Sequence, residues 1–303
     1  MARNDAKLCQ WGSLREALTA FVCAPGGTQS SAHIKPLHWY VACRLVLEGG
    51  IHPDDITPRP PFDVVEGCRD ALGRPVLMHD SARAGSGELA VLGGLKTKDV
   101  DVVVCKPGIG PCIAISMKGM RNALRNLTNR MEEAIGDCTN LHIAYPTLVY
   151  GFLHVLRANR EGPVPASGAS IIEPDENGNV KANDVALRSD GQPTDSVTRY
   201  HDVLTRLAGR AGMREDPTRY EAVALALISA DDDSVGAVLD AYPPVDSPLR
   251  LDDFFERIYR QYDQRFVYSA PALSATTARL EWNPNSPALA DARVTGYMPR
   301  TSA

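Results

Sequence analysis

The chain has 303 residues, 44% of them hydrophobic, which is enough for one large α/β domain or two small ones. A net charge of −5 argues against a protein that coats polyanions over its whole surface, although positive charge can still be concentrated locally. No apolar run approaches the roughly 20 residues of a membrane span, and residues 1–8 lack the apolar core of a secretory signal, so we expect a cytoplasmic protein that does not contact membranes.

The first part of the chain, residues 1–86, is predicted to be mainly helical. Ser13 precedes an apolar stripe and is a typical helix N-cap, and the pair Gly49-Gly50 is a strong helix stop. The predicted elements are a helix over 13–23, a helix over 36–48, a proline-rich loop over 52–61 and a short helix over 62–72. The seven cysteines include no C-x-x-C pair, which predicts reduced thiols and no zinc site.

The periodicity changes in residues 87–156, which we interpret as the catalytic core. Two runs rich in β-branched residues are joined by a Gly/Pro turn and predict an antiparallel hairpin. The apolar stripe that follows has helical spacing, with Gly136 as its expected end. The predicted elements are strands over 100–105 and 112–118, a helix over 120–135 and a buried strand over 147–156.

The rest of the chain begins with residues 161–195, whose Gly, Pro, Asp and Asn content predicts an irregular insertion. Residues 196–303 are expected to supply the remaining core and the C-terminal part. Their predicted elements are a helix over 196–207, a strand over 222–229 and an amphipathic helix over 251–262. We therefore expect an α/β fold over 1–303, in one domain, with a mixed central sheet, flanking helices and extra N-terminal helices.

Four polar residues of the hairpin are candidates for chemistry. Asp99 and Asp101 are two residues apart at the start of the first strand, and Ser116 and Lys118 are two apart at the end of the second. Because side chains of a strand alternate between faces, each pair is expected to share a face. An aspartate and a lysine can then meet at one end of the sheet.

This pattern resembles the PD-(D/E)xK nuclease superfamily, in which an Asp on one strand and an acid-x-Lys on the next bind Mg²⁺ and the attacked phosphate. Ser116 departs from it, because a hydroxyl cannot replace a carboxylate as a strong Mg²⁺ ligand. Glu132 follows Lys118 as K-x13-E, and a subset of type II restriction endonucleases, those cutting CCGG or CC-(N)-GG cores, takes its catalytic acid from this position.

The resemblance implies a restriction-endonuclease-like fold and a sequence-specific, Mg²⁺-dependent endonuclease that cleaves double-stranded DNA as a homodimer or homotetramer. It implies Asp101 and Glu132 as metal ligands, Lys118 as the catalytic lysine and Ser116 in the place of the missing acid. Asp99 is expected to be either a spare ligand or a group that supports the ligands from behind. The sequence leaves two other functions open: a repair or modified-DNA nuclease of this superfamily, and a catalytically silent DNA-binding protein.

The segment after Lys118 is the local basic cluster that the net charge conceals. It carries no acid as far as Arg130, and on a helix Arg121 and Arg125 would lie on the same face as Glu132. In the related endonucleases, residues just after the lysine read bases. We therefore expect DNA contacts from four residues, Arg121, Asn122, Arg125 and Arg130.

A further acid from an N-terminal helix often completes such sites. Glu48 is the preferred candidate because it follows the long apolar helix, and Glu66 is the alternative. The histidines of the N-terminal part, His33, His38 and His52, show no spacing with acids that predicts a metal site.

Overall fold

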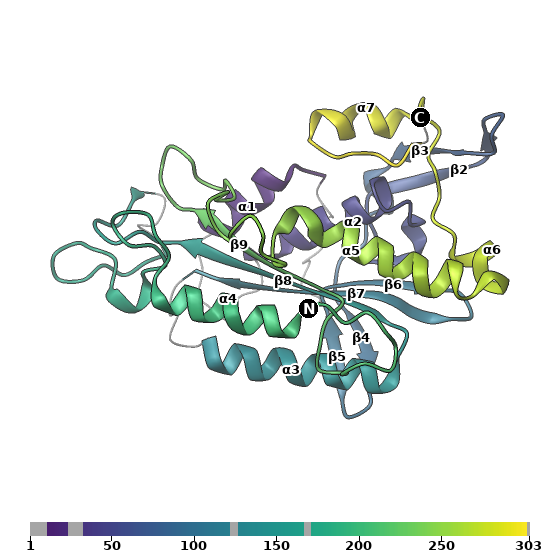
Figure 1. The fold of residues 1–303 in the computed structure, drawn as a ribbon. Coiled ribbons are helices and arrows are strands. Elements are labelled where there is room, and N and C mark those ends of the chain that lie inside the picture. Colours follow the sequence, from purple (N-terminus) through teal and green to yellow (C-terminus); the bar gives the residue numbers. More distant parts are fainter. Residues whose placement is uncertain (1–10, 24–32, 122–126, 167–170, 302–303) are drawn as a thin grey trace, which may run out of the picture.

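The computed structural model describes residues 11–23, 33–121, 127–166 and 171–301 (Figure 1). Its centre is a five-stranded mixed sheet in the order β1-β6-β7-β8-β9. Strands β1, β6 and β7 pair antiparallel, and β7, β8 and β9 run parallel. The strands of this sheet are β1 (Ile56–Thr57), β6 (Val102–Lys106), β7 (Gly110–Met120), β8 (Val149–Ala158) and β9 (Ala222–Ser229).

Helices cover both faces of the sheet (Figure 1). On one face lie α1 (Leu14–Cys23), α2 (Lys35–Leu47) and α5 (Leu251–Tyr262), and on the other lie α3 (Leu127–Ala144) and α4 (Asp195–Leu207). β8 and β9 are buried along their whole length, as expected for parallel strands covered on both sides. The expected α/β class with a mixed sheet and flanking helices is therefore confirmed.

The N-terminal helices form as predicted, and local signals explain their start. The Ser13 hydroxyl accepts a hydrogen bond from the Glu16 main-chain N–H, and the Glu16 carboxylate accepts one from the Ser13 N–H, so α1 begins in a capping box. The N-terminal helices also contact the C-terminal part of the chain: the buried Trp282 indole donates to the Val46 carbonyl at 2.8 Å. The N-terminal helices thus share one core with the C-terminal part of the chain.

The short helix predicted over 62–72 is wrong. These residues form β2 (Phe62–Arg69), which pairs antiparallel with β3 (Pro75–His79) outside the central sheet. The turn between them is closed by the Asp70 carboxylate, which accepts the Arg74 N–H at 2.9 Å. Residues 1–86 are consequently only partly helical in their described portion.

The predicted first strand of the catalytic hairpin is divided in two. β5 (Thr97–Val100) pairs with β4 (Leu89–Leu92) in a separate small hairpin, and only from Val102 does the chain join the central sheet as β6. Asp101 is the residue at the break. This interruption decides where the candidate site forms.

The helix after β7 is displaced along the chain relative to the prediction. It is described from Leu127 to Ala144, so Gly136 lies inside it and does not end it. Residues 161–195 contain one short 3-10 helix, Ala182–Asp184, within their described portion and are otherwise irregular up to the start of α4, as predicted.

The C-terminal region, for which the sequence predicts no element, continues α5 as a π-helical turn (Asp263–Tyr268) and then forms α6 (Ser274–Thr277) and α7 (Pro287–Val294). None of the described helices combines the length and apolar character needed to cross a membrane.

Candidate active site

Asp101 occupies the point where β6 leaves its partner strand. β6 pairs with β7 only as far as Val102 opposite Ile115, whereas β7 continues to Met120. The Met117 main-chain N–H, left without a strand partner on that edge, donates to Asp101 Oδ2 at 2.6 Å. The bond fixes the carboxylate beside the free edge of β7. The strand break therefore places an acid against the strand that carries Lys118.

His38 approaches the same carboxylate from α2. Its Nε2 atom lies 3.4 Å from Asp101 Oδ1, and the side chain is 4% exposed. Among the described residues this buried nitrogen has no hydrogen-bond partner. Burial is the main cause that lowers the pKa of His38 to about 4; Glu88 opposes the shift, and the charges of Lys35 and Lys118 add to it. The imidazole is thus neutral at pH 7, the form that binds metal ions.

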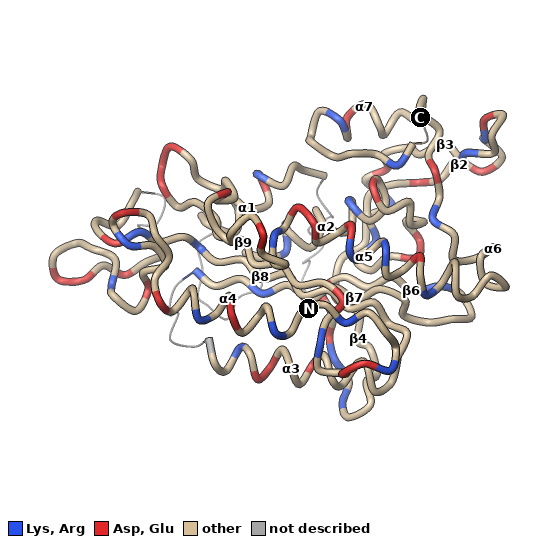
Figure 2. The backbone as a smooth tube through the Cα atoms, viewed as in Figure 1, with Lys and Arg blue, Asp and Glu red and all other residues tan. Residues whose placement is uncertain are grey.

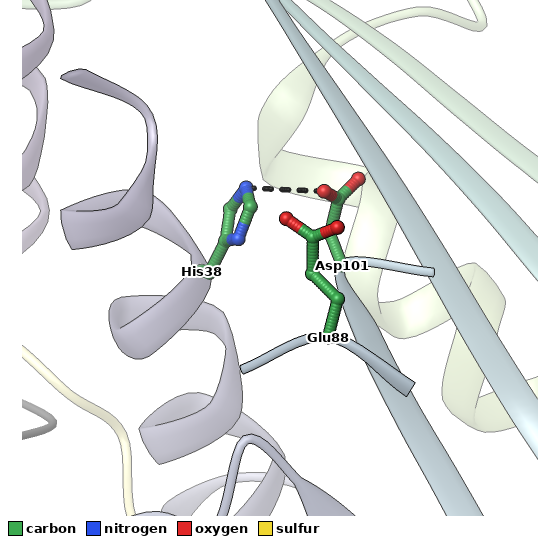
Figure 3. Close-up of side chains that lie close together, drawn as sticks. All are labelled: His38, Glu88 and Asp101. Atoms are coloured by element: carbon green, nitrogen blue, oxygen red, sulfur yellow. Dashed lines mark ion pairs between the residues drawn. The ribbon is translucent and has the colours of Figure 1, made fainter. Parts of the chain in front are cut away.

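Glu88, just before β4, completes a group of three possible ligands. One ligand atom from each of His38, Glu88 and Asp101 can be chosen so that all lie within 4.8 Å of one another, and Figure 3 shows the three side chains converging. Ligands on opposite sides of an octahedral ion with bonds of about 2.1 Å are roughly 4.2 Å apart. The cluster is therefore close to the size of a divalent cation site.

Lys118 flanks this cluster from β7. Burial raises the pKa of Asp101, and the Met117 N–H, Lys118 and Lys98 offset this only in part, so the net shift is upward. A buried carboxylate with a raised pKa and a nearby cation is typical of a functional site. The charge of Lys118 lowers the pKa of both Asp101 and His38, so it acts on the cluster although the amine itself is paired with a glutamate of α3.

The acid that contacts Lys118 is Glu133. The Lys118 Nζ atom lies 3.1 Å from Glu133 Oε1, and Arg130 lies 3.0 Å from the other carboxylate oxygen. Burial raises the pKa of Glu133, but Lys118 and Arg130 lower it by more, so this carboxylate remains ionised. The pair holds the amine over the face of the sheet that α3 covers.

The sequence predicts Glu132 as a metal ligand and catalytic acid, whereas the glutamate that contacts Lys118 in the structure is its neighbour, Glu133. Glu132 is exposed and, among the described residues, makes no ion pair or hydrogen bond to Lys118 or Asp101. Adjacent residues of a helix point about 100° apart, so only one of the two glutamates can face β7. The spacing from Lys118 alone cannot show which of two adjacent glutamates faces β7, because this depends on where the helix begins.

Two other predicted residues lie apart from the cluster. The Ser116 hydroxyl shares a 2.7 Å hydrogen bond with the Tyr150 hydroxyl in the core and is 3% exposed. Asp99 is exposed on β5, opposite Ala90. The strand alternation used to predict a shared face for Asp99 and Asp101 does not apply, because β5 ends at Val100 and Asp101 lies outside it.

Glu48 is also away from the cluster, although its helix is the right one. It lies just after the last residue of α2, where it accepts from Arg44 Nε at 2.6 Å and from the Met298 N–H at 3.0 Å. His38 is ten positions earlier, which is about 15 Å along a helix. The alternative, Glu66, is exposed on β2. The helix thus contributes a histidine and not a second acid.

The predicted DNA-contacting residues are only partly described. Arg121 is 5% exposed, and its carbonyl accepts a hydrogen bond from the Asn159 amide at 2.7 Å. Arg130 is accessible but is paired with Glu133. Asn122 and Arg125 lie outside the described residues. Arg121 does not lie on the helical face predicted for it, because it precedes the described start of α3.

The sequence missed His38, Glu88 and Glu133 as candidates. A weak signal existed for His38, which interrupts a helix whose other side chains around it are buried and apolar. Glu88 and Glu133 carry no such signal, because Glu88 is a single acid in a Gly-rich segment and Glu133 directly follows another glutamate, Glu132.

No family model, no curated protein and no solved structure matches the chain. Function is therefore argued from the chemistry of the site.

Proposed function

We propose that the protein is a divalent-cation-dependent endonuclease that hydrolyses phosphodiester bonds of double-stranded DNA, with its active site at Asp101, His38, Glu88 and Lys118. The observation that carries this proposal is the convergence of three possible metal ligands within 4.8 Å, beside a lysine whose charge acts on two of them. Two carboxylates, an imidazole and a lysine are the groups that metal-assisted phosphodiester hydrolysis uses.

The residues present fit a metal ion. The His38 Nε2 atom is buried with no hydrogen-bond partner among the described residues, and an unsatisfied buried polar atom is costly unless something binds it. Two carboxylate ligands suit Mg²⁺, the cation that the resemblance implies. The imidazole adds a ligand that Mn²⁺ accepts more readily. When bound, such an ion would polarise the phosphate and lower the pKa of a water molecule.

The protein's own groups would supply the other contributions to catalysis. Lys118 would stabilise the negative charge that develops on the phosphate, because its amine is cationic and partly shielded from water. Glu133 and Arg130 would hold that amine in place. The Met117 N–H orients the Asp101 carboxylate, so that acid would not need to reorganise when it binds.

Within this proposal, the finer assignment is a type II restriction endonuclease acting as a homodimer or homotetramer, since cutting both strands of a palindrome needs two sites related by two-fold symmetry. The position of Ser116 favours a second candidate. Its hydroxyl is committed to Tyr150, so one usual acid of the superfamily is absent from the cluster. That arrangement fits a protein that binds metal and DNA without cutting.

The deciding experiment is plasmid cleavage in Mg²⁺ and in Mn²⁺, with wild-type protein, Lys118→Ala and the control Lys181→Ala. Lys181 is an exposed lysine paired with Glu173, so its loss removes the same charge far from the cluster. We expect at least about 100-fold slower cleavage by Lys118→Ala and no change in the control. Equal rates for the two variants would rule out the proposed role of Lys118.

Metal binding is tested separately, by calorimetry with Mn²⁺ alone on wild type and His38→Ala. We expect the affinity to fall by about tenfold or more without the imidazole. Wild-type protein that binds Mn²⁺ through His38 but cuts no DNA, methylated or unmethylated, would support the second candidate. Unchanged Mn²⁺ affinity in His38→Ala would contradict the metal site itself.

A further inference from the structure

A second polar site lies at the other end of the parallel strands. A cavity of about 450 Å³ is formed by the last turn of α4, the loop over 208–221 and α5. This volume is within the range of roughly 300–1,000 Å³ typical of small-molecule sites. The cavity therefore has room for a small organic ligand.

The charge of the lining is mostly positive. Its ionisable residues are Arg210, Arg219, Arg257, Arg260 and Glu221. Glu221 is already bound by Arg210 and, from beside the cavity, by Arg265, so it leaves no free negative charge. Basic and acidic positions are mixed along most of the chain (Figure 2), which makes this basic lining a local feature.

Local structure explains how the arginines reach the cavity. Gly209 has a φ of +86°, a conformation that side chains disfavour, and the turn it allows directs the Ala208 carbonyl to the Arg219 guanidinium. Arg257 donates to the Pro248 carbonyl and pairs with Asp253 at 3.2 Å. These three contacts fix two arginines against the cavity wall.

Arg260 is different from the other three. It is exposed on α5, and its side chain has no ion pair or hydrogen bond within the part of the chain that the structure describes. Gln261, next to it, supplies an uncharged donor to the same lining. A ligand with several negative oxygen atoms could accept from both, while the fixed arginines supply the positive surroundings.

From this cavity we propose a binding site for a small phosphate ester, such as a nucleotide, in which Arg260 is the main phosphate-binding residue. Guanidinium groups bind phosphate through two parallel charge-assisted hydrogen bonds, which explains why arginine and not lysine lines the site. The volume exceeds the needs of a single bound water or ion, which favours an organic ester over a bare anion.

The site is distinct from the candidate active site. Glu221, at the cavity, donates its N–H to the Tyr150 carbonyl, whereas Lys118 lies opposite His154, four residues further along β8. At about 3.3 Å per residue this is roughly 13 Å along the strand. The two proposals can therefore fail independently.

The test is equilibrium binding to the full chain, with inorganic phosphate, adenosine 5′-monophosphate and a short DNA duplex as separate probes. The variants are Arg260→Gln, Arg260→Lys and, as a control of equal charge, Arg199→Gln on the exposed surface of α4. Thermal unfolding of each variant checks that the fold is intact. Lys118→Ala is included because it should keep full affinity for the nucleotide.

We expect the nucleotide to bind wild type, Arg260→Gln to weaken it by at least about tenfold, Arg260→Lys to weaken it less, and Arg199→Gln to leave it unchanged. Phosphate should compete with the nucleotide for one site. The proposal is overturned if neither small probe binds at millimolar concentration, or if Arg199→Gln weakens binding as much as Arg260→Gln. It is also overturned if only the duplex binds through Arg260.

Discussion

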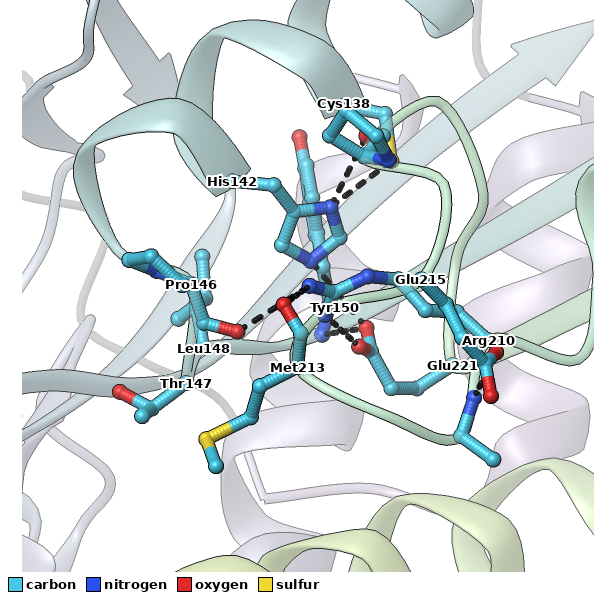
Figure 4. Close-up of polar contacts among 12 residues, drawn as sticks. Cys138, His142, Pro146, Thr147, Leu148, Tyr150, Arg210, Met213, Glu215 and Glu221 are labelled. Carbon is cyan, nitrogen blue, oxygen red and sulfur yellow. Dashed lines mark hydrogen bonds and ion pairs between the residues drawn. The ribbon is translucent and has the colours of Figure 1, made fainter.

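Two buried carboxylates of this protein, Glu221 and Asp101, are surrounded very differently. Glu221 receives Arg210 at 2.6 Å and the Tyr150 N–H at 2.7 Å (Figure 4), and it also receives Arg265 at 2.8 Å. Burial raises its pKa, but His142, Arg265 and this N–H lower it by more, so the net shift is downward. Asp101 receives one main-chain N–H and keeps a raised pKa.

The difference separates a structural acid from a candidate functional one. At Glu221 the negative charge is fully compensated, by two arginines and a main-chain N–H, although Arg210 Nε and Arg265 Nε lack a hydrogen-bond partner among the described residues. At Asp101 the charge is only partly compensated, and the His38 nitrogen 3.4 Å away has no hydrogen-bond partner among the described residues. Incompletely satisfied polar groups of this kind lower stability and favour binding of an ion.

The largest expected effect is the loss of the Glu221 charge. Glu221→Gln would leave Arg210 and Arg265 as buried cations without a counter-charge, and breaking a buried pair in this way costs about 3–5 kcal/mol. Urea unfolding measures it, with Glu176→Gln, an exposed glutamate of the irregular segment, as control. A loss of stability below about 1 kcal/mol would show that the network contributes little to the folded state. Glu221 would then not differ from Asp101 as a structural acid.

An intermediate effect is expected at His154, the neighbour of Lys118 in β8. Burial, with smaller contributions from Arg130 and Lys118, lowers the pKa of His154 from 6.5 to about 3. Between these two values the unfolded chain binds a proton that the folded chain does not, so stability falls as the pH falls. This histidine contributes a slope of up to about 1.4 kcal/mol per pH unit.

His154→Gln should remove that part of the slope between pH 6.5 and pH 3, while His79→Gln, at an exposed position, should leave it unchanged. The measurement is the free energy of unfolding at several pH values. If the two variants keep the same slope, His154 is not held neutral in the fold, and the surroundings of Lys118 differ from those described.

The smallest expected effect is that of Asp101→Asn on stability. Asparagine keeps an acceptor for the Met117 N–H and removes a poorly compensated buried charge, so we expect a change within about 1 kcal/mol. Mn²⁺ binding should nevertheless be lost. The free energy of unfolding of metal-free Asp101→Asn is measured together with that of Glu221→Gln, so that the two stability effects can be compared directly. A loss as large as that of Glu221→Gln would assign Asp101 a structural role.

Much of the fold follows from local patterns. The capping box at Ser13, the continuous apolar runs of β8 and β9 and the amphipathic spacing of α5 each predict their element, because each depends on residues within a few positions of one another. The helix predicted over 62–72 failed where turn chemistry at Asp70 closes a hairpin. Local pattern was also insufficient at Asp101, where a strand breaks without any Gly or Pro signal.

By itself, then, the sequence determined most strands of the central sheet and the helices that flank it, and it nominated Asp101 and Lys118 because two predicted strands are joined by a short turn. The tertiary structure alone decided that His38 and Glu88 join Asp101, that Glu133 and not Glu132 contacts Lys118, and that arginines of α5 and the loop after α4 share a cavity. The physical reason is that these groups are distant in sequence. They meet only because apolar burial packs α2 on one face of the sheet and α3 on the other.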